Sequence, residues 1–183
     1  MTMKSALVGE NKWLGSGEIP IPKPGADQVL VKVHSCPINV SDVIFMSGNW
    51  GVPTVFPFTP GWEGSGEVTE AGSGDHAKSL VGKRVAFKKA GEKTFPWTIG
   101  GAFAEYAIAD IKSVVPLPDD MTFEEGASSF VNPMTALGLI QRMKEIKAKA
   151  IIISAAASQL GRMLIKLCDK EGLVPICTVR RAE

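Results

Sequence analysis

A run of small residues and a pair of arginines near the end of the sequence have the types and spacing to bind a phosphorylated nucleotide. An apolar stretch at 150–154 is followed by small residues that fill the pattern Ala156-x-Ser158-x-x-Gly161. Where such a turn opens a helix, its backbone N–H groups and the helix dipole favour a bound phosphate. About twenty residues later, a second apolar stretch ends in Arg180-Arg181, where an NAD-binding protein carries an acidic residue.

Two guanidinium groups at that place suit an additional 2′-phosphate, which they can bind through paired, charge-assisted hydrogen bonds. The sequence therefore predicts NADPH as the cofactor, in preference to NADH. The predicted cofactor-binding residues in this segment are Ala156, Ala157, Ser158, Gln159, Leu160, Gly161, Arg180 and Arg181.

Both segments also have a simpler interpretation. Only the last glycine of a Gly-x-Gly-x-x-Gly pattern is present, so the turn can equally be a strand-to-helix connection packed with small residues. Gln159 is bulky and could hinder the phosphates, whereas Ser158 adds a hydroxyl donor. The arginines taken alone could be a solvated pair. Their spacing after the turn favours the cofactor interpretation.

The elements that must position these residues form one β–α–β unit. Between the two apolar strands, 150–154 and 174–179, apolar residues recur at helical spacing, and Gly172 suits a left-handed helix cap. Pro175 is tolerated only near the start of the returning strand. The residues that mark the helix are Leu160, Met163, Leu164, Leu167 and Cys168.

A helix is also expected before this unit. Thr122 and Glu125 form a capping-box pattern that starts a helix. We expect this helix to break near Pro133, because proline lacks a backbone donor and restricts the residue before it. Helix should resume from Met134 to Lys144.

The part of the chain up to about residue 121 has the pattern of a small, irregular β-barrel. Val29, Val31 and Val33 alternate along one face of a strand. Glycine and proline separate the short strands. The expected strands are 28–34, 64–69, 82–87 and 103–108.

Composition excludes several classes of protein. With 183 residues, 45% of them hydrophobic, and a net charge of +1, the chain can form a core but has no basic surface for nucleic acid or anionic membranes. No apolar run approaches a bilayer span, and residues 1–12 lack a signal-type stretch. Cys36, Cys168 and Cys177 indicate free thiols, so a cytoplasmic setting is expected.

Five motifs in register resemble the medium-chain dehydrogenase/reductase superfamily. The resemblance implies a GroES-like β-barrel domain over 1–121, followed over 122–183 by the first βαβ unit of a Rossmann domain, which would be incomplete. A complete domain of that kind has six strands. The motifs are Ile38–Asp42, Pro60–Gly66, Val81–Val85, Gly101–Tyr106 and Val131–Ala136.

Within the superfamily, the zinc alcohol dehydrogenases take a cysteine and a histidine ligand from the places that match Asn39 and Trp62. Neither residue is a usual zinc ligand, and the cysteine-rich structural lobe is absent, so no metal is expected. The chain is more similar to the zinc-free quinone oxidoreductases and the mitochondrial 2-enoyl thioester reductases. In the latter, the place of Trp50 holds a catalytic tyrosine, whose proton an indole N–H cannot replace.

The resemblance also implies further site residues. Family members hold the ribose and nicotinamide at the places of Asn132 and Thr135. Asn39 and Trp50 are the expected catalytic-site positions, although Asn39 suits a structural turn nearly as well. Aromatic side chains could wall a pocket for a quinone or enone, or simply form core. These are Trp50, Phe56, Phe58 and Trp62.

The expected function is zinc-independent, NADPH-dependent reduction of a quinone or of an α,β-unsaturated carbonyl or enoyl thioester. The expected partner is that small molecule. An incomplete domain leaves its sheet bare, so either the 183 residues are a portion of a longer protein, or a partner or self-association covers the bare sheet. The alternative is a degenerate, non-catalytic member that serves as a structural subunit of a larger complex. The enoyl reductases make a mitochondrial location the alternative to the cytoplasm.

Overall fold

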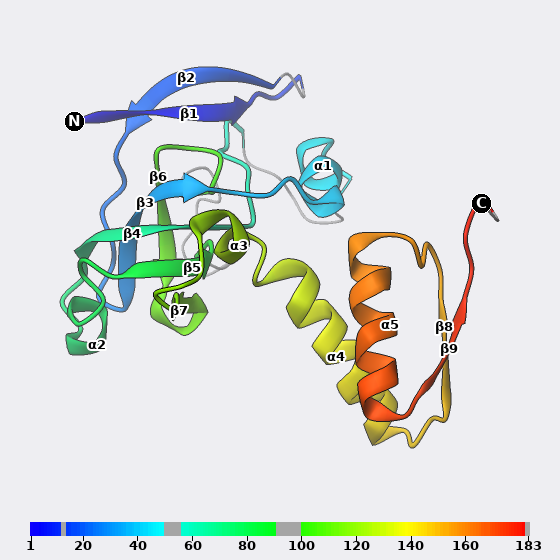
Figure 1. Ribbon diagram of the computed structural model, residues 1–183. Coiled ribbons are helices and arrows are strands. Elements are labelled where there is room, and N and C mark those ends of the chain that lie inside the picture. Colours follow the sequence, from blue (N-terminus) through cyan, green and yellow to red (C-terminus); the bar gives the residue numbers. More distant parts are fainter. Residues whose placement is uncertain (12–13, 50–55, 91–99, 182–183) are drawn as a thin grey trace. The chain divides into compact units, whose positions relative to one another are not determined.

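The computed structural model describes residues 1–11, 14–49, 56–90 and 100–181 (Figure 1). Backbone contacts divide the chain into two compact units, Met1–Ser129 and Phe130–Glu183. The sequence analysis places the boundary between the two domains after residue 121. This domain boundary remains a prediction. None of the helices in the described ranges has the length and apolar character needed to cross a bilayer.

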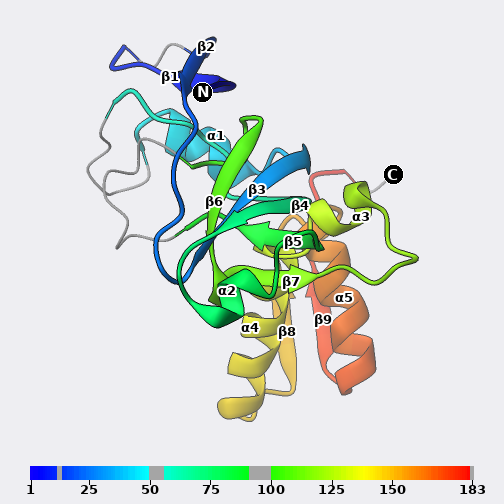
Figure 2. The ribbon, with the colours of Figure 1, turned by 90° about the vertical axis from the view of Figure 1, so that its left-hand side faces the viewer.

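The first unit is built on a five-stranded antiparallel sheet with the order β6-β3-β4-β5-β7 (Figure 2). A separate antiparallel pair, β1 with β2, lies outside this sheet. The strands are β1 (Thr2–Val8), β2 (Leu14–Pro20), β3 (Gln28–Ser35), β4 (Glu63–Ala71), β5 (Arg84–Lys88), β6 (Tyr106–Asp110) and β7 (Val114–Pro116).

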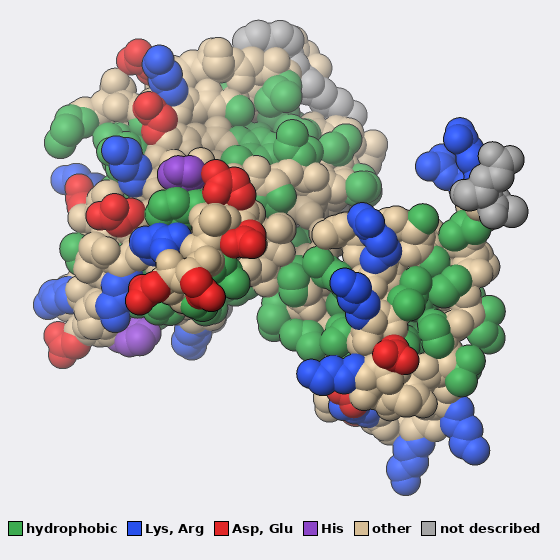
Figure 3. All heavy atoms as spheres, viewed as in Figure 1, with side chains coloured by type: hydrophobic (Ala, Val, Ile, Leu, Met, Phe, Trp, Pro, Cys, Tyr) green, Lys and Arg blue, Asp and Glu red, His purple; other side chains and the backbone are tan. Residues whose placement is uncertain are grey.

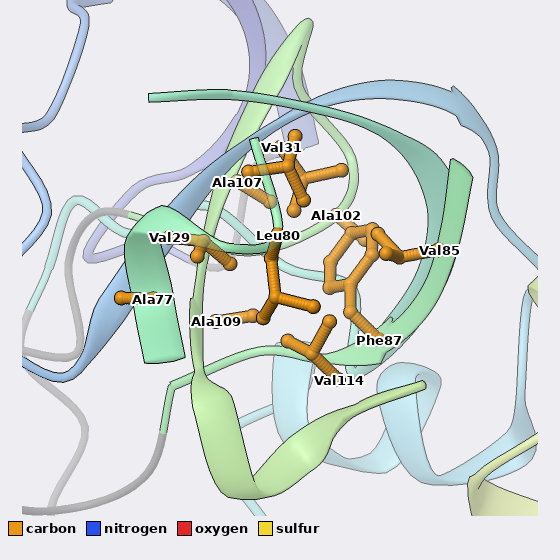
Figure 4. Packing of buried hydrophobic residues seen from close by; sticks show 11 residues of the cluster. Val29, Val31, Ala77, Leu80, Val85, Phe87, Ala102, Ala107, Ala109 and Val114 are labelled. Carbon is orange, nitrogen blue, oxygen red and sulfur yellow. The ribbon is translucent and has the colours of Figure 1, made fainter. Parts of the chain in front are cut away.

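The core of the first unit lies where these strands bury their valines. Val29, Val31, Val85 and Phe87 are fully buried, and Leu80 closes the cluster from the segment after α2 (Figure 4). The alternation in the sequence therefore gave the correct inward face of β3. The short helical segments of the unit are α1 (Val40–Met46), α2 (Asp75–Lys78), the 3-10 turn η1 (Ile111–Ser113) and α3 (Phe123–Ala127).

Two strands begin later than expected. The strand expected from Phe103 begins only at Tyr106, because Phe103 N–H donates to the carbonyl of Pro60 rather than to a sheet neighbour. The strand expected from Gly82 begins at Arg84, because Lys83 N–H closes a turn onto the carbonyl of Leu80.

The capping box predicted for α3 is confirmed. Thr122 Oγ1 accepts from Glu125 N–H at 3.2 Å, and Glu125 Oε2 accepts from Thr122 N–H at 2.9 Å. The predicted break near Pro133 is wrong, because the break falls at 128–130, before α4 (Val131–Glu145). Pro133 lies in the first turn of α4, where a backbone N–H would have no helical acceptor, so the ring is tolerated there.

The second unit contains the predicted β–α–β arrangement. Strands β8 (Ala150–Ile153) and β9 (Val174–Cys177) pair in parallel and are joined by α5 (Gln159–Glu171). Gly172 has a φ of 66°, which confirms the predicted left-handed cap. Helix α4 packs against α5, and the core includes Ala136, Ile140, Ile153, Leu164 and Cys168.

One face of the β8–β9 pair is exposed. Ile152, Val174 and Ile176 are 71%, 59% and 51% exposed. By the alternation of strands, these side chains point away from the face that Ile153 turns toward α5.

Candidate functional site

Helix α5 begins at the turn that the sequence marks as a phosphate-binding loop. Ser158 is its N-cap residue, and Ser158 Oγ accepts from Gly161 N–H at 3.1 Å. The Ser158 side chain therefore satisfies one of the unpaired donors at the start of the helix.

The remaining N–H groups of the turn divide into two sets. Ala156 donates to the carbonyl of Thr178 at 3.1 Å, and Ser158 donates to the carbonyl of Ala155 at 2.8 Å. Within the described ranges, Ala157, Gln159 and Leu160 N–H donate to no backbone carbonyl. Three donors at the positive end of α5 are thus available to an anion.

The side chains of the turn also take distinct positions. Ala156 is only 2% exposed and packs into the core of the unit, so it offers an anion neither an N–H nor a side chain. Gln159 Oε1 accepts from Arg162 Nη2 at 2.8 Å, which holds this side chain along the surface of the helix.

Gly161 allows the helix to approach the turn closely. A Cβ at this position would lie 2.5 Å from the carbonyl oxygen of Ala156. Such a contact is far inside van der Waals distance with backbone atoms that have little freedom to move. The one glycine of the pattern that the sequence retains is therefore the one that sets helix-to-turn packing.

Ala155 has a φ of 50°, in the left-handed region that glycine adopts without cost. We expect Ala155→Gly to raise the free energy of unfolding by about 1 kcal/mol, because the strain of the methyl group is removed. Urea unfolding measures this difference. Ala157→Gly is the matched control and should not stabilise, since Ala157 is not among the described residues with positive φ. An Ala155→Gly variant no more stable than the parent would contradict the strain.

The two arginines lie beside this turn. A hollow of about 1120 Å³ is lined by residues from the turn and from the segment that follows β9, and Figure 3 shows basic side chains next to the C-terminal end. The lining residues are Ala155, Ala157, Ser158, Thr178, Val179, Arg180 and Arg181. Of the predicted cofactor residues, the structure thus brings Ala157, Ser158, Arg180 and Arg181 together.

Asn132 and Thr135 lie in the first turns of α4 and are not among the residues that line this hollow. Thr135 Oγ1 donates to the carbonyl of Val131 at 2.6 Å, a hydrogen bond within the helix. Their contact with a nucleotide remains a prediction.

A second group of polar residues is buried in the first unit. Asn39, 9% exposed, is the N-cap residue of α1, and its Nδ2 donates to Glu63 Oε1 at 2.9 Å. Asp42 accepts from Asn39 N–H at 2.8 Å and from Trp62 N–H at 3.0 Å. Burial raises the pKa of the Asp42 carboxyl, and the Glu63 charge adds to this rise, against the lowering by its two backbone donors.

The aromatic residues predicted to wall a pocket pack on one another. Phe45 meets Phe58 and Trp62 edge to face, each with a centroid distance of 4.9 Å, and Phe56 lies beside Phe58. Phe58 is fully buried, so it has a core position, whereas Trp62 is half-buried. Trp50 lies outside the described residues.

Lys89 interacts with both the buried polar residues and the aromatic residues. The sequence analysis did not single it out. It is 5% exposed, and its Nζ lies 4.9 Å from the Trp62 ring centroid and 5.5 Å from that of Phe45. The sequence signal was the two-residue spacing of Val85, Phe87 and Lys89, which places Lys89, one residue beyond β5, on the same face as two buried residues. Glu63, fully buried, was missed as well, inside a motif that was considered only for Trp62.

Burial lowers the pKa of the Lys89 ammonium to about 8. Between pH 8 and 10.5 the unfolded chain then binds this proton while the folded chain does not. The free energy of unfolding should therefore rise with pH across that window. Urea unfolding at several pH values measures the slope.

Lys89→Arg supplies the reference for this slope, since a guanidinium keeps its proton throughout the window. The raised pKa values of the Cys36 and Cys168 thiols act in the opposite direction but are common to both proteins. Equal slopes in the parent and Lys89→Arg would show that Lys89 does not titrate in this range.

The described residues contain no group of three or more His, Cys, Asp and Glu side chains arranged to hold a metal ion. Asn39 and Trp62 occupy the two places that the resemblance marks for zinc ligands. The Asn39 amide is bonded to Glu63, and the Trp62 ring packs on Phe45. These residues do not fit a zinc ion.

Comparison with known proteins shows the family to which the chain belongs. Residues 25–119 match the model of the alcohol dehydrogenase GroES-like domain. The chain belongs to this family and, with it, to the quinone oxidoreductase-like branch of the medium-chain dehydrogenase/reductase superfamily. The predicted order of a GroES-like domain and a partial Rossmann-like segment is confirmed.

Two curated relatives illustrate the similarity. The quinone oxidoreductase of Sus scrofa is 33% identical over 153 residues, which are 83% of this chain and 43% of the relative. The mitochondrial enoyl-[acyl-carrier-protein] reductase of Caenorhabditis elegans is 32% identical over 167 residues, 91% of this chain and 45% of the relative. The chain spans about half the length of the curated relatives it matches.

Solved structures are similar over almost the whole chain. A protein of Mesorhizobium loti designated an NADPH:quinone reductase superimposes with a TM-score of 0.87 at 38% identity, covering 99% of this chain and 55% of that one. A mycobacterial protein solved in complex with NADPH has a TM-score of 0.77 at 27% identity, covering 99% and 52%.

Proposed function

We propose that the chain is part of an NADPH-dependent oxidoreductase that reduces a quinone or an α,β-unsaturated carbonyl without zinc. The observation that carries the proposal is the hollow beside the start of α5, which Ala157, Ser158 and the two arginines line together. The names of the relatives support the class of reaction, since they include quinone oxidoreductases and an enoyl reductase. The mycobacterial complex supports the cofactor.

The residues fit such a dinucleotide in a specific way. The N–H groups of Ala157, Gln159 and Leu160 would bind the pyrophosphate at the start of α5. Arg180 and Arg181 would bind the 2′-phosphate that distinguishes NADPH from NADH. NADPH would supply the hydride, and the protein would hold the reactants together and exclude water.

The resemblance extends the proposal to residues outside the hollow. Asn132 and Thr135 would contact the ribose and nicotinamide, and Asn39 would face the reacting centre. The hydrogen bond from Asn39 to the buried Glu63 fixes the orientation of its amide for either a catalytic or a structural role. We also propose that the active protein is a homo-oligomer or part of a larger assembly.

The test combines calorimetry with a turnover assay on the purified protein. Binding of NADPH at micromolar concentration, weaker binding of NADH, and oxidation of NADPH by a quinone or an enone are the expected results. NADPH binding without turnover of either substrate class would remove the enzymatic assignment.

The alternative, a non-catalytic structural subunit, is favoured by two features of the turn. Ala156 and Ser158 N–H are engaged by the protein itself, and Ala155 is strained where a glycine would fit. The two engaged N–H groups leave fewer donors for a pyrophosphate. If the protein binds no NADPH in the calorimeter, this alternative replaces the enzyme.

A further inference from the structure

A second hollow lies in the first unit and includes none of the residues that the proposed function uses. It has a volume of about 510 Å³. Its lining comes from the start of β1, from Ile21 just after β2, and from residues on and beside the paired strands β3 and β6. All of these residues belong to the unit Met1–Ser129, so the hollow is complete within that unit.

Lys32 and Tyr106 line this hollow from neighbouring strands. They are direct partners in the antiparallel register of β3 and β6, so their side chains are nearest neighbours on one face of the sheet. Val29 and Val31 turn the opposite face of β3 into the core, which leaves Lys32 exposed and Tyr106 half-buried. The hollow therefore has an ammonium group beside a phenol hydroxyl.

The ammonium and the hydroxyl are both available to a ligand. Among the described residues, no carboxylate forms an ion pair with Lys32, and Glu67, its register partner on β4, is no exception. The Tyr106 hydroxyl makes no hydrogen bond to any described residue either. Two neighbouring donors of this kind, one of them charged, suit a carboxylate.

Glu105 adds a negative charge at a fixed place in the same lining. Its N–H donates to the carbonyl of Lys4 at 3.0 Å, and its carbonyl accepts from Val33 N–H at 2.9 Å, so its backbone is held between β1 and β3. Its Oε2 accepts from Lys4 N–H at 2.7 Å. Within the described part of the chain, its other carboxylate oxygen has no donor, so it can accept from a ligand.

Apolar side chains complete the lining. Ile21 and Val33 are half-buried, and the ring of Tyr106 presents a further apolar surface. Glu105 would repel a simple anion, and Lys32 would repel a simple cation. The lining is instead complementary to a molecule that carries both charges beside a hydrocarbon group.

We propose that this hollow binds a small zwitterion with an apolar side chain, of the class of the free α-amino acids. Lys32 and Tyr106 hold its carboxylate, Glu105 holds its ammonium, and Ile21 packs against its side chain. The proposal is independent of the NADPH site, since no residue of that site takes part.

An NMR titration of the whole, isotope-labelled chain with L-phenylalanine tests the site. The hollow is open and the ligand is small, so a dissociation constant on the order of 1 mM is expected. Two analogues separate the charges. 3-Phenylpropionate lacks the ammonium and 2-phenylethylamine lacks the carboxylate, and each should bind about tenfold more weakly or worse, because a charge-assisted hydrogen bond is lost.

Single variants assign the contacts. Lys32→Met and Glu105→Gln should each weaken phenylalanine binding by about tenfold, and Tyr106→Phe by about threefold. The glutamine keeps an oxygen that can accept from Lys4 N–H, so only the charge is removed. Lys88→Met is the matched control, because Lys88 is an exposed lysine of the same sheet outside the hollow, and it should leave binding unchanged. Urea unfolding checks that each variant is folded.

The amides that shift during the titration show where phenylalanine binds. Shifts at Val33 and Tyr106 that saturate together support the site. No shift there, or shifts confined to the hollow of Arg180 and Arg181, would overturn the proposal. Equal binding by the parent and by Lys32→Met would overturn it as well, and binding of 3-phenylpropionate as tight as that of phenylalanine would exclude a zwitterion site.

Discussion

Replacement of both Arg180 and Arg181 by glutamate should weaken NADPH binding by about 10²- to 10³-fold. Each guanidinium can make charge-assisted hydrogen bonds worth about 1.5–3 kcal/mol to a phosphate, and the carboxylates would repel it. NADH lacks the 2′-phosphate, so its affinity should change much less or improve. Calorimetry with both dinucleotides measures the reversal of preference.

The control for this double variant is Arg142→Glu. Arg142 is an exposed arginine on α4 in the same unit, paired with Glu145 and absent from the lining of the hollow. It should leave both affinities unchanged. If the double glutamate variant still prefers NADPH, the two arginines do not bind the 2′-phosphate and the proposed cofactor site is wrong.

Asp42→Ala should lower the free energy of unfolding by about 3–5 kcal/mol, the cost of removing one partner from a buried group of charges. The carboxylate accepts N–H groups from Asn39 and Trp62, and both donors would lose a buried acceptor. Lys89 would also lose the negative charge that offsets its burial. Urea unfolding gives the difference.

Asp75→Ala provides the comparison for Asp42. Asp75 is a fully exposed residue on α2 whose partner Lys78 lies 3.9 Å away, so its replacement should change the free energy of unfolding little. A loss of similar size at Asp42 would show that the buried carboxylate contributes little to the stability of the first unit.

The sequence was most informative where periodicity and caps act locally. The spacing of Leu164 and Cys168 identified α5, and Gly172 identified its end, because helix formation and capping depend on neighbouring residues. Pro133 misled the prediction of α4, since the effect of a proline depends on which turn of a helix contains it. That position is not defined until the helix start is known.

The candidate site was harder to predict, because tertiary contacts decide which N–H groups are engaged and which side chains are buried. Arg180 and Ser158 were expected at one place, and the structure brings them to one hollow. The engagement of Ala156 N–H by Thr178 depends on how the turn meets β9, which no local pattern records. Lys89 was not singled out, although it follows Val85 and Phe87 at the two-residue spacing of one strand face, and the structure buries all three.

The close approach at Gly161 makes the nucleotide-binding turn and α5 a single mechanical element. Because the helix backbone lies directly on the carbonyl of Ala156, the turn cannot shift while the helix stays in place. Fraying of the first helical turn would disperse the N–H groups that an anion requires. Ligand affinity and the local opening of this helix are therefore linked, and a bound dinucleotide would slow amide hydrogen exchange along α5.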